Sequence, residues 1–300
     1  MITVARGTKQ IRKLEPALGE KPPQKAAIQC QAALKQYVEG RLKQRRAHQA
    51  AFRPLLEKAQ APLRDLLTPD KTLLRKLVKQ QQAAFRVTRK KPVLRHPLLP
   101  DVPQPGIEQG FLLKFPPYDE AFQYASNPYP AAQAQADKAV GTYKFDVEGD
   151  GDSNAASAGI GVYFFAYEDN PIQRVAALVD YDYIWGTWSI NGYTAHNDGA
   201  TNIWVWGVSE NRWVAQTGSL SPYWSDGTGW FDQHGSGGYP PTEQFGRQST
   251  ETFFPAAANN FYLVWIWSEG SCDDSASILG ASYAAQQQRM SVPMITFGSL

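Results

Sequence analysis

Cysteine is nearly absent from this 300-residue chain, which has only Cys30 and Cys272. Two thiols so far apart cannot form the dense disulfide framework that stabilises small secreted domains, so we expect both to be buried thiols. Histidine is also scarce, and His196 and His234 are the two that follow residue 100. Neither belongs to the H-x-H or H-x-x-x-H spacing of a metal site. The sequence therefore predicts no disulfide scaffold and no cofactor.

Long apolar runs are missing as well. No stretch approaches the roughly 20 apolar residues that span a bilayer. Residues 1–23 also lack the apolar centre of a secretory signal. We therefore expect a soluble protein in the cytoplasm, and release by a signal-independent route stays open.

Signatures of catalysis are missing too. The chain has no phosphate-cradling glycine loop, and residues 218–221 (GSLS) lack the flanking glycine of a G-x-S-x-G nucleophile elbow. Asp226, Asp232 and Glu243 offer carboxylates for glycoside cleavage, but that chemistry depends on a separation that a sequence does not contain. A non-enzymatic protein is the main prediction, and glycoside-hydrolase-like activity is the alternative.

Acidic and aromatic residues are scarce in the first hundred residues. This part holds 23 Lys and Arg against 6 Asp and Glu, and only three aromatic residues, Tyr37, Phe52 and Phe85. The remaining two hundred residues hold 7 basic against 22 acidic residues, and 34 of the 37 Phe, Trp and Tyr. The formal net charge of +2 thus conceals a region of +17 and a region of −15. Such a division predicts two structural units.

We divide the chain into four segments. Residues 1–23 are predicted to be an extended arm, 24–91 a basic helical segment, 92–130 a linker and 131–300 an acidic, Trp-rich β-sandwich. The linker contains nine prolines, which block regular helix and favour extended chain. Within it, residues 111–115 are expected to form a first edge strand. The predicted fold class is α+β with the helices and the strands segregated along the chain.

The basic segment has the spacing of about three amphipathic helices. The first is predicted to present a stripe made of Ile28, Leu34, Val38 and Leu42, flanked by Ala27, Cys30 and Tyr37. A second helix is expected to begin near Pro54, because proline is tolerated at a helix start but not inside. A third is expected to begin at Pro69 after Thr68 as the N-cap. These helices are predicted to anchor or oligomerise the protein.

Basic clusters at residues 45–46, 75–76 and 89–91 suggest contact with nucleic acid or an anionic membrane. No helix-turn-helix spacing, zinc pattern or set of base-stacking aromatics accompanies them. The alternative is that the clusters are solvated helix faces balanced by the acidic unit.

After residue 140 the apolar residues alternate with a period of two, which predicts strands with one wet face. Tyr143, Phe145 and Val147 face one way, while Lys144, Asp146 and Glu148 face the other. Residues 131–139 are expected to form one or two helical turns. The other strands are predicted at 160–167, 175–185, 202–208, 211–217, 261–267, 275–283 and 290–297. Short strands joined by Gly, Asn, Asp and Ser turns indicate an antiparallel sandwich of the jelly-roll or lectin-like type.

All nine tryptophans lie between residues 185 and 267. The pairs Trp204/Trp206 and Trp265/Trp267 each share a strand face and are interpreted as core or cross-strand packing residues. Residues 216–250 show little strand pattern and are predicted to be a long loop. Its aromatic and polar side chains are the material of a glycan site. The candidate ligand-binding residues are Trp224, Asp226, Trp230, Asp232 and His234.

A second, weaker site is suggested by alternating oxygen ligands between residues 146 and 152. The calcium candidates are Asp146, Glu148, Asp150 and Asp152. Ser157 stands at the twelfth position, where the EF-hand loop has a bidentate glutamate, and no helix flanks the segment. A plain hairpin turn is the alternative.

Together these features predict a non-enzymatic interaction protein, in which basic helices anchor or oligomerise the chain and the sandwich binds a glycan or another protein chain. The first alternative is a structural subunit of a homo-oligomer, particle or filament, in which the basic part of one copy meets the acidic part of the next. The second alternative is association with nucleic acid or an anionic membrane through the basic part.

Overall fold

A computed structural model describes residues 24–63, 70–89, 112–127, 131–149, 153–190, 194–227, 242–274 and 281–299. These residues form two long helices, a short 3₁₀ turn and eleven strands. The predicted arm, residues 1–23, lies outside the described residues. In the part of the chain that is described, neither helix is long and apolar enough to cross a membrane.

The strands form two sheets in which every pair is antiparallel. Sheet A has the order β3 (Ala132–Asp137), β4 (Thr142–Glu148), β11 (Ala281–Ser299), β6 (Asn170–Ile190) and β9 (Thr242–Ala256), with β1 (Leu112–Lys114) on one end of β11. Sheet B has the order β2 (Glu120–Ala125), β5 (Asn154–Ala166), β10 (Asn260–Asp274), β7 (Ala195–Gly207) and β8 (Arg212–Gly227). The predicted antiparallel sandwich is confirmed.

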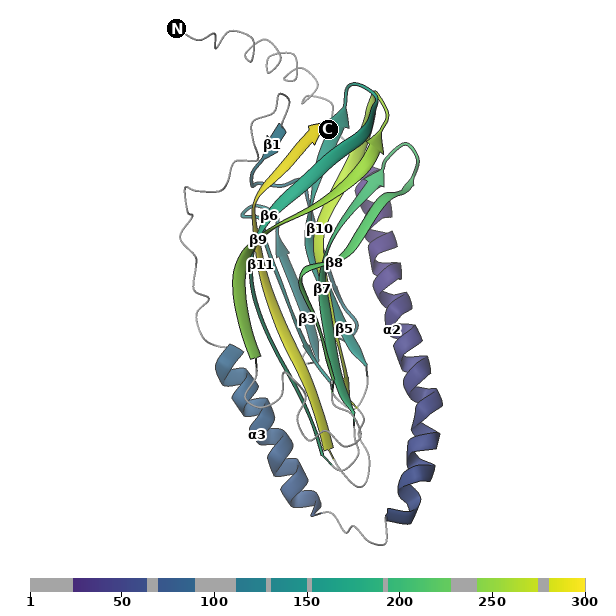
Figure 1. The fold of residues 1–300 in the computed structure, drawn as a ribbon, viewed down its shortest axis with the longest axis vertical. Helices are drawn as coiled ribbons and strands as arrows, with labels where there is room; N and C mark the ends of the chain where they lie inside the picture. The colour runs from purple at the N-terminus through teal and green to yellow at the C-terminus, as the bar shows by residue number, and fades with distance from the viewer. Residues whose placement is uncertain are drawn as a thin grey trace.

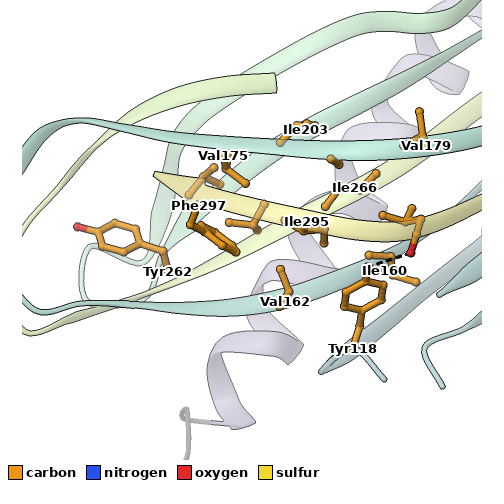
Figure 2. Close-up of a cluster of buried hydrophobic side chains, with 14 of the residues drawn as sticks. Tyr118, Ile160, Val162, Val175, Val179, Ile203, Tyr262, Ile266, Ile295 and Phe297 are labelled. Carbon is orange, nitrogen blue, oxygen red and sulfur yellow. Dashed lines mark hydrogen bonds between the residues drawn. The ribbon is translucent and has the colours of Figure 1, made fainter. Parts of the chain in front are cut away.

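The main core lies between the two sheets. Period-two alternation sends every second side chain of the long central strands inward, as Figure 2 shows for Val162, Val179 and Ile266. Tyr143, Phe145 and Val147 point into the sandwich as predicted.

On the opposite face of β4, Asp146 and Glu148 are buried, although a wet face was predicted there. The Gln287 amide donates a hydrogen bond to the carboxylate of Asp146 from the neighbouring strand β11. Part of this carboxylate's hydration is therefore replaced by a protein partner.

Two predictions for residues 92–139 are wrong. Residues 120–125 form strand β2 inside the predicted linker, and residues 132–137 form strand β3 in place of a helical turn. The edge strand expected at 111–115 is confirmed, because residues 112–114 form β1 and pair with β11. In β3, Ala132, Ala134 and Ala136 alternate with polar residues and contact the sandwich core. Pairing with β4 makes this segment a strand, because intrinsic helix propensity is a weak preference that tertiary contacts override.

The predicted long loop 216–250 is largely strand. β8 continues to Gly227, and β9 begins at Thr242. In β9 the buried Thr250, Thr252 and Phe254 alternate with exposed residues. The period is that of a strand, but the inward threonines hid it from a pattern based on apolar residues.

Helix α2 (Gln24–Gln60) is one helix where two were predicted. Pro54 lies inside it, in a stretch whose described side chains are exposed, so water can bind the backbone carbonyl that proline leaves unpaired. The 3₁₀ turn η2 (Ala61–Leu63) follows. The buried stripe is Ala27, Cys30, Leu34, Val38 and Leu42. Ile28, predicted for this stripe, is 69% exposed.

Helix α3 (Lys71–Arg89) begins two residues later than predicted. Its N-cap is Asp70, whose carboxylate accepts hydrogen bonds from the backbone N–H groups of Thr72 (2.9 Å) and Leu73 (3.1 Å). Near its other end, Phe85 is fully buried against a cluster on the outer face of sheet A, made of Ile184, Trp188, Tyr283 and Ala285.

The two helices cover opposite outer faces of the sandwich, giving the layers α2, sheet B, sheet A and α3 (Figure 1). The basic helices and the acidic sandwich therefore pack together within one chain.

Candidate functional site at the interface of helix α2 and sheet B

The outer face of sheet B is aromatic where the first half of α2 crosses it. Trp204 and Trp206 of β7 and Trp265 and Trp267 of β10 point away from the sandwich core. Trp204 lies directly opposite Trp265 in the register, and its ring meets that of Trp267 edge to face at 4.9 Å. The four tryptophans are buried, which confirms their interpretation as packing residues.

The indole groups under α2 differ in their hydrogen bonds. The Trp265 N–H donates to the sulfur of Cys30 at 2.9 Å. The N–H groups of Trp204, Trp206 and Trp267 are buried and have no hydrogen-bond acceptor among the described residues. A buried donor without an acceptor costs free energy. The packing of α2 on this face therefore leaves three indole N–H donors without an acceptor among the described residues.

Farther along the same face the tryptophans give way to small and acidic residues. The alternation that places Trp204 outward on β7 also places Ala200 and Asp198 outward, and on β10 it continues from Trp267 to Glu269 and Asp273. Above them, α2 presents Arg41 and Arg45, which are four residues apart and therefore lie on the same helix face.

The two arginines and three carboxylates form a connected network. Arg41 donates one N–H group to Glu269 Oε1 at 2.6 Å and another to Asp198 Oδ2 at 3.3 Å. Arg45 donates to Asp273 Oδ2 at 3.0 Å and to Asp198 Oδ2. The Ser271 hydroxyl donates to the other oxygen of Asp198. The network ties α2 to both β7 and β10.

A cavity of about 120 Å³ lies between the helix and this part of the sheet. Its lining is Val38, Arg41, Leu42, Arg45, Ala155, Asp198, Gly199, Ala200, Glu269, Gly270 and Ser271. The space exists because alanines and glycines form the floor where tryptophans stand farther along the same strands. The ring of Tyr37, 37% exposed, flanks Arg41 with its centroid 5.9 Å from the guanidinium carbon.

Burial dominates the electrostatics of this site. It raises the pKa of Glu269 from 4.5 to about 7, although the Arg41 guanidinium acts in the opposite direction. Burial also raises the pKa of the Tyr37 hydroxyl, and the Glu269 carboxylate adds to that effect. The cavity therefore combines guanidinium groups that donate hydrogen bonds with carboxyl oxygens that accept them.

The structure describes the backbone of two of the five residues that the sequence suggested for a glycan site. Trp224 and Asp226 lie in strand β8, paired with Gly199 and Asn197, and not in a loop. Trp230, Asp232 and His234 lie outside the described residues, so the common site that includes these three stays a prediction.

The calcium site also stays a prediction. Asp146 and Glu148 lie in strand β4, while Asp150 and Asp152 lie outside the described residues. Within the described part of the chain, no group of three or more His, Cys, Asp or Glu side chains is arranged to hold a metal ion.

One charged residue of this site, Arg45, belongs to the basic cluster 45–46, and its pairing with Asp198 and Asp273 fits the alternative of a basic helix face balanced by the acidic unit. The other charged residues of the site were not predicted from the sequence, and they are Arg41, Asp198, Glu269 and Asp273. A signal was present for β10, since the alternation of Trp265 and Trp267 continues to Glu269. The pairing of β7 with β10 was not foreseeable, because a sequence does not show which strands are neighbours.

No known protein family matches this chain. No curated protein matches it by sequence. Two solved structures resemble part of it weakly. One is the carbohydrate-binding module TmCBM61 in complex with β-1,4-galactotriose, at 7% identity and a TM-score of 0.19, covering 60% of this chain and 89% of the module. The other is infectious bursal disease virus strain Gx, at 13% identity and a TM-score of 0.22, covering 60% of this chain and 36% of the viral chain. At these TM-scores neither resemblance decides the fold or the function.

Proposed function

We propose that this protein is a non-enzymatic glycan-binding protein whose binding site is the cavity between α2 and sheet B. The observation that carries the proposal is the convergence of Arg41, Asp198 and Glu269 on one cavity beside the exposed Tyr37. Carboxylates accept hydrogen bonds from sugar hydroxyls, guanidinium groups donate to them, and an aromatic ring covers the C–H face of a pyranose.

The size of the cavity limits the ligand. Pockets that enclose drug-sized ligands measure roughly 300–1,000 Å³, and this cavity measures about 120 Å³. It therefore suits one terminal sugar residue of a longer glycan, with the rest of the glycan outside. The three indole N–H groups on the same face that lack an acceptor among the described residues also support the proposal, because they are further donors for hydrogen bonds.

The sandwich that carries the site is proposed to be a jelly roll. Strands β4 to β11 divide into the orders 4-11-6-9 and 5-10-7-8, so the chain crosses between the sheets at most of its connections. This distribution fits the double-sheet arrangement built from two Greek keys, which occurs in lectin and capsid domains.

A glycan array probed with the wild-type protein tests the proposal. The variant Asp198→Asn removes one charge at the centre of the network and is expected to lose binding. The matched control is Asp180→Asn, which removes the charge of another paired aspartate. Asp180 accepts hydrogen bonds from Arg247 on the far side of the sandwich. The control is expected to bind like the wild type.

Two results would contradict the proposal. One is the absence of binding to any glycan by the wild-type protein. The other is binding that survives Asp198→Asn but is lost in Trp224→Ala or Trp230→Ala, which would return the site to the segment suggested by the sequence.

A further inference from the structure

Two sets of exposed apolar side chains lie at opposite ends of the molecule. At the helical end, Phe52 and Leu55 of α2 and Leu73 of α3 are 49%, 62% and 52% exposed. The turn end includes the β5–β6 connection and the neighbouring part of β9, and its exposed apolar residues are Tyr167 (36%), Ile172 (47%) and Phe253 (44%). In Figure 1 the helical end lies at the bottom, and the tight turns between strands lie at the top.

The helical end is a continuation of the packing face of α2. Phe52 follows Leu34 by 18 residues, which is about five turns of helix, so both lie on the same line along α2. Leu34 is fully buried against sheet B, whereas about half of Phe52 is exposed. The apolar stripe therefore runs past the sheet that it covers.

The helical end is also basic. The exposed basic residues on the last turns of α2 and the first turns of α3 are Arg53, Lys58, Lys71, Arg75, Lys76 and Lys79. Glu57, paired with Arg53 at 3.4 Å, and the capping Asp70 are the acidic residues of the same described turns. Six positive charges thus accompany two negative ones.

The turn end is acidic. Glu168 and Asp169 in the β5–β6 turn and Glu210 in the β7–β8 turn are exposed, and they outnumber the exposed Arg212 at the start of β8. Asp169 accepts a hydrogen bond from the Ala258 N–H at 2.8 Å, and this bond ties the β5–β6 turn to the β9–β10 turn. The Glu251 carboxylate is paired with Arg174 on the adjacent strands.

We propose that the helical end of one molecule binds the turn end of a second copy. Apolar side chains meet apolar side chains in this contact, and a basic surface meets an acidic one. Because the two surfaces differ, the contact is head to tail and produces an open filament or a ring. This assembly is independent of glycan binding.

A lipid surface and a nucleic acid fit these observations less well. An amphipathic helix binds a bilayer by lying flat in its surface, whereas α2 and α3 run along the length of the sandwich and are packed on its two faces (Figure 1). Nucleic-acid backbones bind Lys and Arg but do not bury the exposed Phe52 and Leu55.

Sedimentation velocity over a concentration series at low and high salt measures the assembly. The wild-type protein is expected to associate at low salt and to dissociate as salt screens the charges. The double variant Phe52→Gln/Leu55→Gln is expected to weaken association by about tenfold or more. The matched control is Val140→Gln, which is 56% exposed in the β3–β4 turn beside the middle of β11 and is expected to associate like the wild type.

A charge swap identifies the two surfaces that meet. Arg75→Glu/Lys76→Glu and Glu168→Lys/Asp169→Lys change exposed residues, so both variants are expected to fold, which circular dichroism checks. Each is expected to be monomeric alone, and an equal mixture of the two is expected to associate again. A monomeric wild type at low salt, or a mixture that stays monomeric, would overturn the proposal. The proposal also fails if the wild type stays monomeric while binding anionic vesicles or DNA.

Discussion

The carboxyl group of Glu269 should make the stability of this protein depend on pH in a direction that is unusual for a glutamate. Burial raises its pKa from 4.5 to about 7 in the folded state, so folding favours the protonated form. Glu269 therefore costs no stability below its unfolded pKa of 4.5. As the pH rises from 4.5 through about 7, the unfolded chain ionises first and the folded state loses stability relative to it.

The magnitude follows from the two pKa values. The interval between 4.5 and about 7 corresponds to a loss of about 3 kcal/mol, which is complete once the pH exceeds the folded value. The variant Glu269→Gln has no proton to lose at this position. The free energy of unfolding of Glu269→Gln minus that of the wild type should therefore increase by about 3 kcal/mol as the pH rises through this interval.

Urea unfolding at a series of pH values from about 4 to about 9 measures this difference, and contributions of other titrating groups cancel between the two proteins. Glu251→Gln is the matched control, because it removes a charge-paired carboxylate that is 43% exposed. Its difference from the wild type should stay within about 1 kcal/mol. The reasoning is refuted if the difference between Glu269→Gln and the wild type is the same at every pH, or shrinks as the pH rises.

Three further substitutions test the packing by changes in unfolding free energy. Gly159→Ala should lower the unfolding free energy by at least about 2 kcal/mol, because its added Cβ would lie 2.4 Å from a side chain and 2.7 Å from a backbone oxygen of β10. Gly40→Ala in α2 is the control: its Cβ meets nothing within 4 Å, and the substitution should raise the unfolding free energy by about 1 kcal/mol. Equal changes in the two variants would contradict this reasoning. Phe85→Ala should cost about 3–5 kcal/mol and free α3 from sheet A, while Leu73→Ala, at the exposed start of α3, should change stability by less than about 1 kcal/mol. Arg45→Ala should cost roughly 1–3 kcal/mol, since two carboxylates lose a partner in a half-buried network, and no loss would mean that the network does not hold α2.

The parts of the fold that could be predicted are those with a clear apolar period. Alternation placed Tyr143 and Phe145 inward, and helical spacing placed Leu34 and Val38 on a buried stripe. The predictions failed where a local preference competes with a partner distant in sequence. The alanine-rich segment 132–137 forms a strand because β4 pairs with it, and the threonine-rich β9 hides its period from a search for apolar residues.

The candidate site was harder to predict than the fold. The charge division at residue 100 indicated that the two parts of the chain complement each other, but it did not show which residues meet. Arg41 and Glu269 are 228 positions apart in sequence. Only the packing of α2 across β7 and β10 brings them together, so the site arises from tertiary structure and not from a local motif.

Hydrogen exchange, measured with and without the tightest-binding glycan from the array, tests the central claim most directly, because it locates the bound ligand along the chain. If the site lies between α2 and sheet B, the glycan should slow the exchange of amides at 37–45, 196–200 and 269–273. Slowing confined to residues 224–241, with these three segments unchanged, would contradict the account.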